Sequence, residues 1–128
     1  MTENQRTVEW YMEGFNEADH AKILSCLTDD VEWILPGVYH LKGKAAFERE
    51  IENDAFIAPP EVTTLRMIEQ DDVVIAEGTV RVGRKAGGMV HLVFCDVFEL
   101  ERGKIRKLTS YLMEVKGRAA EPGTYVPS

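Results

Sequence analysis

Four consecutive segments in the second half of this 128-residue chain alternate apolar and polar residues with a period of two. That period is typical of β-strands, because successive side chains of a strand point to opposite faces. The joints between the segments, QDD, RKAGG and RG, are short enough to be hairpin turns. The pattern therefore predicts an antiparallel meander of four strands over residues 61–69, 73–83, 89–101 and 104–115.

The first half of the chain has a different, helical spacing. Val8, Tyr11, Met12 and Phe15 form one apolar stripe at i, i+3, i+4 and i+7. A helix, a meander and the segments between them indicate an α+β fold, in which helices cover one face of a curved sheet. Helices are predicted over 3–17, 20–27 and 44–56, a strand over 31–35 and a loop over 36–43.

Charge and cysteine content narrow the range of partners and compartments. The net charge of −7 argues against nucleic acid or an anionic membrane surface as the main partner. The N-terminal segment lacks the apolar core of a signal peptide, and no apolar run approaches the roughly 20 residues of a membrane helix. Cys26 and Cys95 lie far apart, which favours a reducing compartment. We expect a cytoplasmic, single-domain protein over 1–128, with an irregular tail over 116–128.

The third strand of the predicted meander contains the stretch HLVFCDVFEL, with one aspartate, Asp96, in its middle. Both faces of this strand are rich in apolar residues, so both are expected to be covered. Helices would cover one face, and a second subunit would cover the other, which predicts a homodimer through the sheet. His91 is on the face opposite Asp96 and is expected at the dimer contact.

Asp96 shares its face of the strand with Phe94 and Phe98. An ionised carboxylate there is costly unless it is paired, so desolvation favours the neutral acid. A neutral acid is a hydrogen-bond donor, and a donor in a dry pocket stabilises a developing oxyanion. The alternative is a structural aspartate that a bulge turns to solvent or that pairs with an arginine, for which the candidates are Arg66, Arg81 and Arg106.

Three stretches of the chain carry a resemblance to a known family. They are VEWYMEGFNEADHAKILSCLTDDVEW, LKGKAAFEREI and FCDVFELERGKIRKLTSYLMEV, and the similarity extends over roughly residues 5–115. In order and spacing they resemble the SnoaL-like and ketosteroid-isomerase-like branch of the NTF2-like superfamily. The resemblance implies a cone, in which a strongly bent antiparallel sheet wraps around three N-terminal helices and encloses a deep apolar pocket. It also implies dimerisation.

The resemblance implies roles for individual residues as well. Isomerases of this family hold an oxyanion between a tyrosine of the first helix and a protonated strand aspartate, and Tyr11 and Asp96 match these positions. The isomerase base, an aspartate just before a proline, falls on Leu35 in WILPG, and leucine cannot take a proton. Polyketide cyclases of the superfamily use one strand aspartate as acid and base, as Asp96 would. His40, in the loop after WILPG, is the candidate for a replacement base.

A hydrophobic small molecule is the expected partner of the predicted pocket. No histidine spacing matches a metal site and no Gly-rich phosphate loop is present, so neither a metal nor another cofactor is expected. The residues expected to line the pocket are Phe15, Trp33, Leu35, Phe47, Phe94, Phe98 and Leu112.

Two classes of function are open at this point. The first is a ketosteroid-isomerase-like or polyketide-cyclase-like enzyme that uses acid/base chemistry and oxyanion stabilisation on a hydrophobic, carbonyl-bearing molecule. The second is a non-catalytic ligand-binding or protein-interaction module, which the leucine at position 35 favours. An epoxide hydrolase of the same fold would need an Asp–Arg–Asp set around a water, and residues 91–100 and their neighbours do not supply one.

Overall fold

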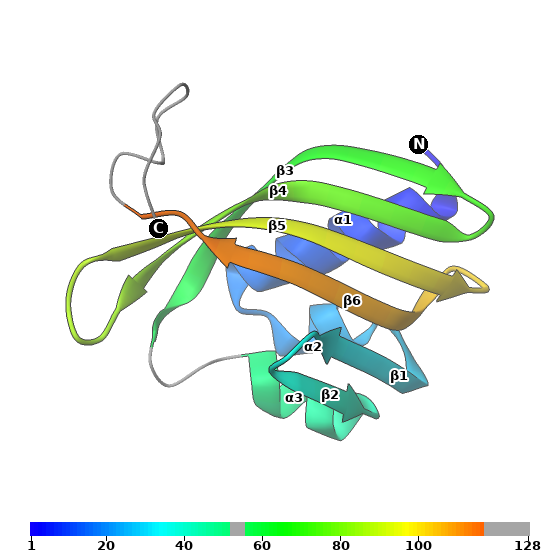
Figure 1. Cartoon of the computed structure of the whole chain (residues 1–128). Helices are drawn as coiled ribbons and strands as arrows, with labels where there is room; N and C mark the ends of the chain where they lie inside the picture. The colour runs from blue at the N-terminus through cyan, green and yellow to red at the C-terminus, as the bar shows by residue number, and fades with distance from the viewer. Residues whose placement is uncertain (52–55, 117–128) are drawn as a thin grey trace.

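The computed structural model describes residues 1–51 and 56–116, in which a curved sheet covers one long helix and two short ones (Figure 1). The strands lie in the order β2-β1-β6-β5-β4-β3, and β3 to β6 form the predicted antiparallel meander. The predicted α+β fold is confirmed, while the predicted tail lies outside the described residues from position 117 onward. The elements are α1 (Glu3–Glu17), α2 (His20–Leu24), β1 (Leu27–Leu35), β2 (Tyr39–Lys42), α3 (Lys44–Ile51), β3 (Phe56–Gln70), β4 (Val73–Arg84), β5 (Met89–Glu101) and β6 (Lys104–Glu114).

Helix α1 lies along the concave side of the meander, as Figure 1 shows. Thr2 is its N-cap, and Thr2 and Gln5 form a capping box in which each side chain accepts a hydrogen bond from the other's backbone N–H. The predicted apolar stripe is buried against the sheet at Val8, Tyr11 and Met12. No helix in the described ranges has the length and apolar character needed to cross a membrane.

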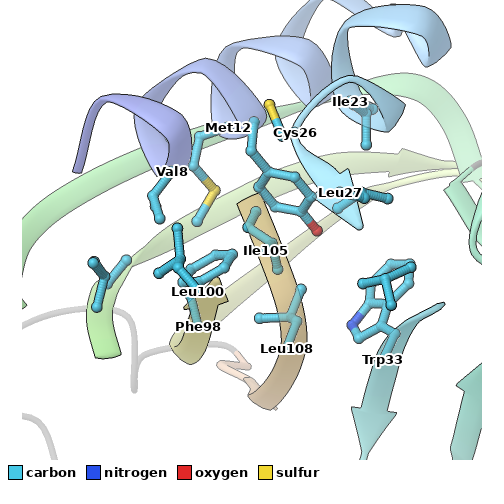
Figure 2. Packing of buried hydrophobic residues seen from close by; sticks show 14 of the residues in the cluster. Val8, Met12, Ile23, Cys26, Leu27, Trp33, Phe98, Leu100, Ile105 and Leu108 are labelled. Atoms are coloured by element: carbon cyan, nitrogen blue, oxygen red, sulfur yellow. The ribbon is translucent and has the colours of Figure 1, made fainter. Parts of the chain in front are cut away.

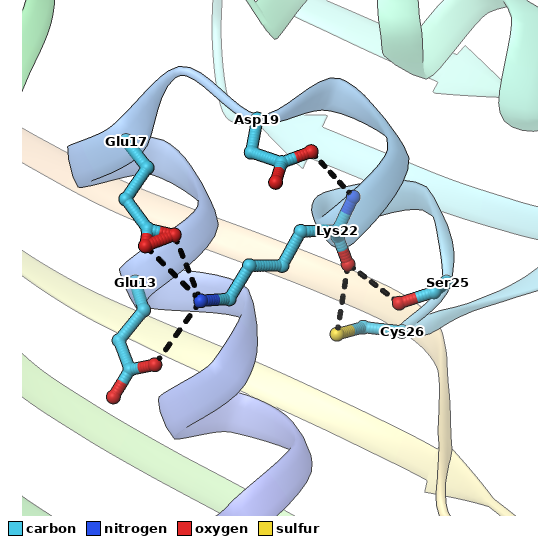
Figure 3. Close-up of polar contacts among 6 residues, drawn as sticks. All are labelled: Glu13, Glu17, Asp19, Lys22, Ser25 and Cys26. Atoms are coloured by element: carbon cyan, nitrogen blue, oxygen red, sulfur yellow. Dashed lines mark hydrogen bonds and ion pairs between the residues drawn. The ribbon is translucent and has the colours of Figure 1, made fainter.

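Charged side chains fix the corner between α1 and α2 (Figure 3). Asp19 caps α2, because its carboxylate accepts a hydrogen bond from the backbone N–H of Lys22 at 3.0 Å. The Lys22 ammonium group binds two carboxylates of α1, Glu17 at 2.8 Å and Glu13 at 3.3 Å. The helices approach so closely here that a Cβ atom on Gly14 would lie 2.7 Å from a side chain of α2. The short second helix is therefore held firmly against the first.

Helix α2 is shorter than predicted. It ends at Leu24 instead of residue 27, because the following residues join the sheet: the Ile105 N–H donates to the Cys26 carbonyl at 2.7 Å, and β1 starts at the next residue. Strand β1 then runs parallel to β6, with Trp33 beside Leu108. Among the described strands, this parallel pair is the one departure from an antiparallel sheet.

The predicted loop over 36–43 contains a strand. After a tight turn closed by the Val38 N–H and the Leu35 carbonyl at 2.9 Å, β2 pairs antiparallel with β1. Gly37 in this turn has a φ of 80°, a left-handed conformation that glycine adopts without strain. The loop prediction is wrong because a four-residue edge strand offers too short an alternation to be recognised in the sequence.

The predicted end of the third helix at residue 56 is also wrong. Helix α3 reaches Ile51, residues 52–55 lie outside the described part of the chain, and Phe56 already belongs to β3. Strand β3 contains Pro59 and Pro60, which lack the N–H of a ladder hydrogen bond, and its pairing with β4 shifts register beside them. The sheet tolerates both prolines because β3 is an edge strand.

The core fills the concave side of the sheet. Figure 2 shows Val8 and Met12 of α1 facing Phe98, Leu100 and Ile105 of the sheet. Along β5, buried residues alternate with more exposed ones, as the period of two predicts. The face of β5 that packs against the helices carries Val90, Phe94, Asp96, Phe98 and Leu100.

Candidate active site

A cavity of about 180 Å³ lies between α1 and the concave face of the meander. Its walls are mostly apolar, and its polar side chains are one tyrosine, one aspartate, one serine and one indole. A few polar groups converging in an apolar cavity are typical of small-molecule sites. The lining residues are Tyr11, Met12, Phe15, Trp33, Ile51, Pro60, Val62, Val80, Leu92, Phe94, Asp96, Ser110 and Leu112.

Asp96 lies between Ala76 of β4 and Ser110 of β6, and only 9% of its surface is exposed. Its Oδ1 atom is buried and has no hydrogen-bond partner among the described residues. Burial raises the pKa of the Asp96 carboxyl from 3.8 to about 7, and a hydrogen bond from Ser110 acts in the opposite direction. Near neutral pH, Asp96 can therefore both donate and accept a proton.

The arginines that would make Asp96 a structural ion pair bind other carboxylates. Within the described part of the chain, none of the ion pairs includes Asp96. The carboxyl group therefore sits in mostly apolar surroundings, with no counter-charge from the residues that the structure describes. Arg66, Arg81 and Arg106 pair instead with Glu77, Glu61 and Glu99, respectively.

Tyr11 is the second titratable group of the cavity, and it comes from the first half of the chain. Helix α1 buries its ring in edge-on contact with Phe15 and Phe98, whose centroids lie 5.1 Å and 5.4 Å from its own. Burial raises the pKa of the Tyr11 hydroxyl well above its usual value, and the negative charge of Asp96 raises it further. Tyr11 therefore stays protonated and can act as a hydrogen-bond donor in the cavity.

Ser110 was missed by the sequence interpretation. It is 4% exposed, lies directly opposite Asp96 across the β5–β6 pair, and accepts a hydrogen bond from Trp33 Nε1 at 3.1 Å. The available signal was the period of two, which places Ser110 between Leu108 and Leu112 on the inward face of β6. A serine between two inward-facing leucines indicates a candidate site residue in the same way as Asp96 does on β5.

The structure brings together most of the site residues predicted from the sequence. Phe47 and Phe98 do not line the cavity, but lie behind it in ring contact with Tyr11. The predicted residues that do line the cavity are Tyr11, Phe15, Trp33, Phe94, Asp96 and Leu112.

Leu35 and His40 lie elsewhere. Leu35 lines an open groove of about 800 Å³ between the β1–β2 turn and the outer face of β5 and β6. His40 pairs with Glu32 at 2.7 Å. Glu32 precedes the cavity residue Trp33 in β1 and therefore points to the opposite face of the sheet. Neither Leu35 nor His40 is among the residues that line the Asp96 cavity.

The sequence model of the SnoaL-like domain family matches residues 8–108 of this chain. The chain belongs to the SnoaL-like domain family. The matched range runs from the middle of α1 to the middle of β6 and includes both Tyr11 and Asp96. The family resemblance read from the sequence is thereby confirmed. No curated protein matches the sequence at a significant level.

Solved structures confirm the NTF2-like fold of this SnoaL-like domain. An NTF2-like protein of unknown function from Burkholderia pseudomallei is 25% identical, with a TM-score of 0.79 over 94% of this chain and 95% of that chain. A candidate polyketide cyclase from Xanthomonas campestris pv. campestris is 24% identical, with a TM-score of 0.78 over 85% and 89%. A candidate ketosteroid isomerase from Kribbella flavida is 18% identical, with a TM-score of 0.73 over 98% and 91%.

The donor set of this SnoaL-like domain limits the chemistry of the cavity. Among the described residues, no three His, Cys, Asp or Glu side chains gather closely enough to hold a metal ion. Within the same residues, the cavity is lined by one carboxylate and by no arginine, so an Asp–Arg–Asp set is not assembled there. The arrangement favours proton transfer and hydrogen bonding by Asp96 and Tyr11.

Proposed function

We propose that this SnoaL-like protein is an acid/base enzyme of the ketosteroid-isomerase or polyketide-cyclase type. Its substrate is a hydrophobic, carbonyl-bearing small molecule. The supporting observation is Asp96, a carboxyl group that is nine-tenths buried in the wall of an apolar cavity. Its Oδ1 atom has no hydrogen-bond partner among the described residues, and burial raises the pKa of the carboxyl group to about 7. Tyr11 supplies a protonated hydroxyl in the same cavity.

In the proposed reaction, ionised Asp96 removes a proton from the carbon next to the substrate carbonyl. Negative charge moves to the carbonyl oxygen, and the Tyr11 hydroxyl donates a hydrogen bond to the resulting enolate. Protonated Asp96 then returns the proton to a different carbon, or to the oxygen formed when the enolate closes a ring. Because the pKa of Asp96 is about 7, neither proton transfer is strongly disfavoured at neutral pH.

The cavity limits the charge and size of the proposed substrate. Its described lining contains no Lys, Arg or His, so a phosphate or carboxylate group would be buried without a counter-charge. An apolar cavity of about 150 Å³ holds a benzene molecule, and this cavity measures about 180 Å³. We therefore expect an uncharged compound with one ring and one carbonyl group inside the cavity, while a polycyclic skeleton would extend through its mouth.

Hydrogen–deuterium exchange at the carbon next to the carbonyl tests this function without knowledge of the natural substrate. Cyclohexanone and cyclohexenone are incubated with the protein in D₂O and followed by NMR. Asp96→Asn is expected to lower the enzymatic exchange rate by about 10²–10⁴-fold, and Tyr11→Phe by about 10²-fold. Asp71→Asn is the matched control, because Asp71 is exposed in a turn at a φ of 51° that asparagine also adopts.

A second candidate function is non-catalytic ligand binding. It is favoured by Leu35 and by the described lining, in which only Asp96 and Tyr11 titrate. A binding module would quench the fluorescence of Trp33 saturably with the same ketones and leave their exchange at the buffer rate. Equal exchange by wild type and Asp96→Asn contradicts the enzymatic proposal, and saturable binding without exchange supports the alternative.

A homodimer through the outer face of the sheet is also proposed. His91 is exposed on this face, and Val93 lies opposite Met113 across the β5–β6 pair. Apolar side chains gathered on neighbouring strands favour burial against a second copy. The exposed or partly exposed apolar side chains of this face include Ile75, Met89, Val93, Tyr111 and Met113.

Val93→Lys is expected to convert this dimer into a monomer, because it places a charge within the proposed contact. Analytical ultracentrifugation of wild type and variant measures the effect. Leu65→Lys, at an exposed position of edge strand β3, is the control and is expected to leave the dimer intact. A monomeric wild-type protein at high protein concentration would contradict the dimer.

A further inference from the structure

We propose that Ser110, anchored by the indole of Trp33, is a positioning residue that fixes the orientation of the Asp96 carboxyl group in the cavity wall. The evidence is the arrangement of three buried side chains on β1, β6 and β5. The proposal rests on the proposed function for the identity of the ligand. Its test below uses the protein alone, so that the two proposals can fail separately.

The chain of hydrogen bonds begins at a fixed donor. Trp33 Nε1 donates to Ser110 Oγ at 3.1 Å, in a buried setting. The Trp33 ring stacks on Phe47 with centroids 4.4 Å apart and an interplanar angle of 24°, and it meets the Tyr39 ring edge-on at 5.5 Å. An indole nitrogen only donates hydrogen bonds, so the direction of this bond is defined. Two aromatic neighbours hold the donor in place.

The second step concerns the hydroxyl proton of Ser110. A serine hydroxyl has one proton to donate and two lone pairs to accept with. Because Trp33 binds one lone pair, the Ser110 O–H is directed away from the indole. Asp96 lies directly opposite Ser110 in the β5–β6 register, and both side chains line the same cavity. The Asp96 carboxyl group accepts a hydrogen bond from Ser110, which lowers its pKa against the effect of burial. Ser110 thus holds the Asp96 carboxyl group in one orientation within the cavity wall, in which Oδ1 is buried and has no hydrogen-bond partner among the described residues.

The other neighbours of Asp96 do not compete for this role. The titratable groups that face it are Tyr11 from α1 and Tyr39 from β2, and burial keeps both hydroxyls protonated by raising their pKa values. Helix α3, β3 and β4 contribute apolar lining, namely Ile51, Pro60, Val62 and Val80. Among the described side chains, Ser110 is the hydrogen-bond donor that lowers the pKa of Asp96 against the effect of burial. Its hydroxyl therefore sets the balance between the acid and base forms.

The wild-type protein provides the first test. Ionisation of Asp96 strengthens the Ser110 hydrogen bond, and a polarised Ser110 oxygen becomes a better acceptor for Trp33. The indole N–H resonance of Trp33 is therefore expected to shift with pH at the same midpoint as the carboxyl carbon of Asp96. Trp10, the other tryptophan of the sequence, is 52% exposed on α1 and is the internal control, with no transition at that midpoint expected.

Variants at position 110 provide the second test. Ser110→Ala is expected to move the midpoint of the Asp96 carboxyl titration upward by about one pH unit, because the charged form loses a donor. Ser110→Thr keeps the hydroxyl and is expected to restore the wild-type midpoint. Thr109→Val, on the neighbouring residue that points to the outer face, controls for general disturbance of β6 and is expected to change nothing.

The proposal is overturned if the Trp33 resonance does not follow the Asp96 titration, or if folded Ser110→Ala titrates at the wild-type midpoint. If Ser110→Ala does not fold, the wild-type Trp33 resonance decides. Both readings are taken without substrate. A further outcome is that the Asp96 and Trp33 titrations show the expected midpoints while the protein does not catalyse hydrogen–deuterium exchange of the ketones. That result would reject the enzymatic function alone and would leave Ser110 as a positioning residue in a binding protein.

Discussion

At pH 8, Asp96→Asn is expected to raise the free energy of unfolding by about 4 kcal/mol, although it removes the proposed acid/base group. The buried Asp96 carboxyl has a pKa of about 7 in the folded chain, against 3.8 for an exposed aspartate. The two pKa values differ by about three units, and each pKa unit corresponds to about 1.4 kcal/mol, which gives the expected gain. Asparagine is neutral in both states and is free of this cost.

The sign of the effect follows from the raised pKa. Below about pH 4, Asp96 is protonated in both states of the wild type, and its contribution to stability is fully present. As the pH rises to about 7, the unfolded chain loses the proton while the folded chain keeps it, and this contribution is progressively lost. Above about pH 7 the loss is complete. The gain from Asp96→Asn should therefore be near zero at pH 4 and largest at pH 8.

Urea denaturation of wild type and Asp96→Asn between pH 4 and pH 8 measures the difference. Asp71→Asn, at an exposed turn position, is the control and should change the free energy of unfolding by less than about 0.5 kcal/mol at every pH. A stability difference that does not vary with pH would show that Asp96 is not held as a neutral acid. A stabilised but inactive Asp96→Asn variant would instead indicate that the fold gives up stability to keep a reactive group in its cavity.

Phe47→Ala is expected to lower the free energy of unfolding by about 3–5 kcal/mol, because it removes a large side chain from a close-packed site. Phe47 is 1% exposed, stacks on Trp33 and meets the Tyr11 ring edge-on at 6.2 Å. The loss should also release the Trp33 ring. Urea denaturation measures the stability, and a red shift of the tryptophan emission reports the changed surroundings of Trp33.

Phe47→Leu is the matched control for this substitution. Leucine keeps much of the volume and is expected to cost about 1.5 kcal/mol or less, while giving up the flat surface on which Trp33 stacks. A loss below about 1 kcal/mol for Phe47→Ala would contradict the role of Phe47 as the support of the cavity wall. It would mean that neighbouring side chains of α3 and β1 close the space.

The meander and the inward orientation of Asp96 could be predicted because both depend on local pattern. A period of two assigns each side chain of β5 to one face without knowledge of the rest of the chain. The stripe of Val8, Tyr11 and Met12 on α1 then identifies the helix that covers the apolar face. The placement of Tyr11 and Asp96 in one cavity was implied by the family resemblance and is seen in the lining.

The pairings of β1 and β2 could not be predicted in the same way. The parallel pair of β1 with β6 joins segments about 75 residues apart, as in Trp33 beside Leu108, and no local alternation encodes such a partner. The side-chain contacts of Trp33 and His40 depend on these pairings. The sequence interpretation therefore predicted Trp33 as pocket lining but placed His40 in a loop.

The sequence by itself determined the four strands, the first helix and the face on which Asp96 lies, because these follow from the spacing of apolar residues along a short segment. Only the tertiary structure decided which side chain stands opposite Asp96. A regular hairpin at residues 102 and 103 would place Thr109 there, and the register shift between Glu99 and Leu100 places Ser110 there instead. A shift of one residue exchanges the two faces of a strand, and whether it occurs depends on how β5 and β6 pack together in the curved sheet.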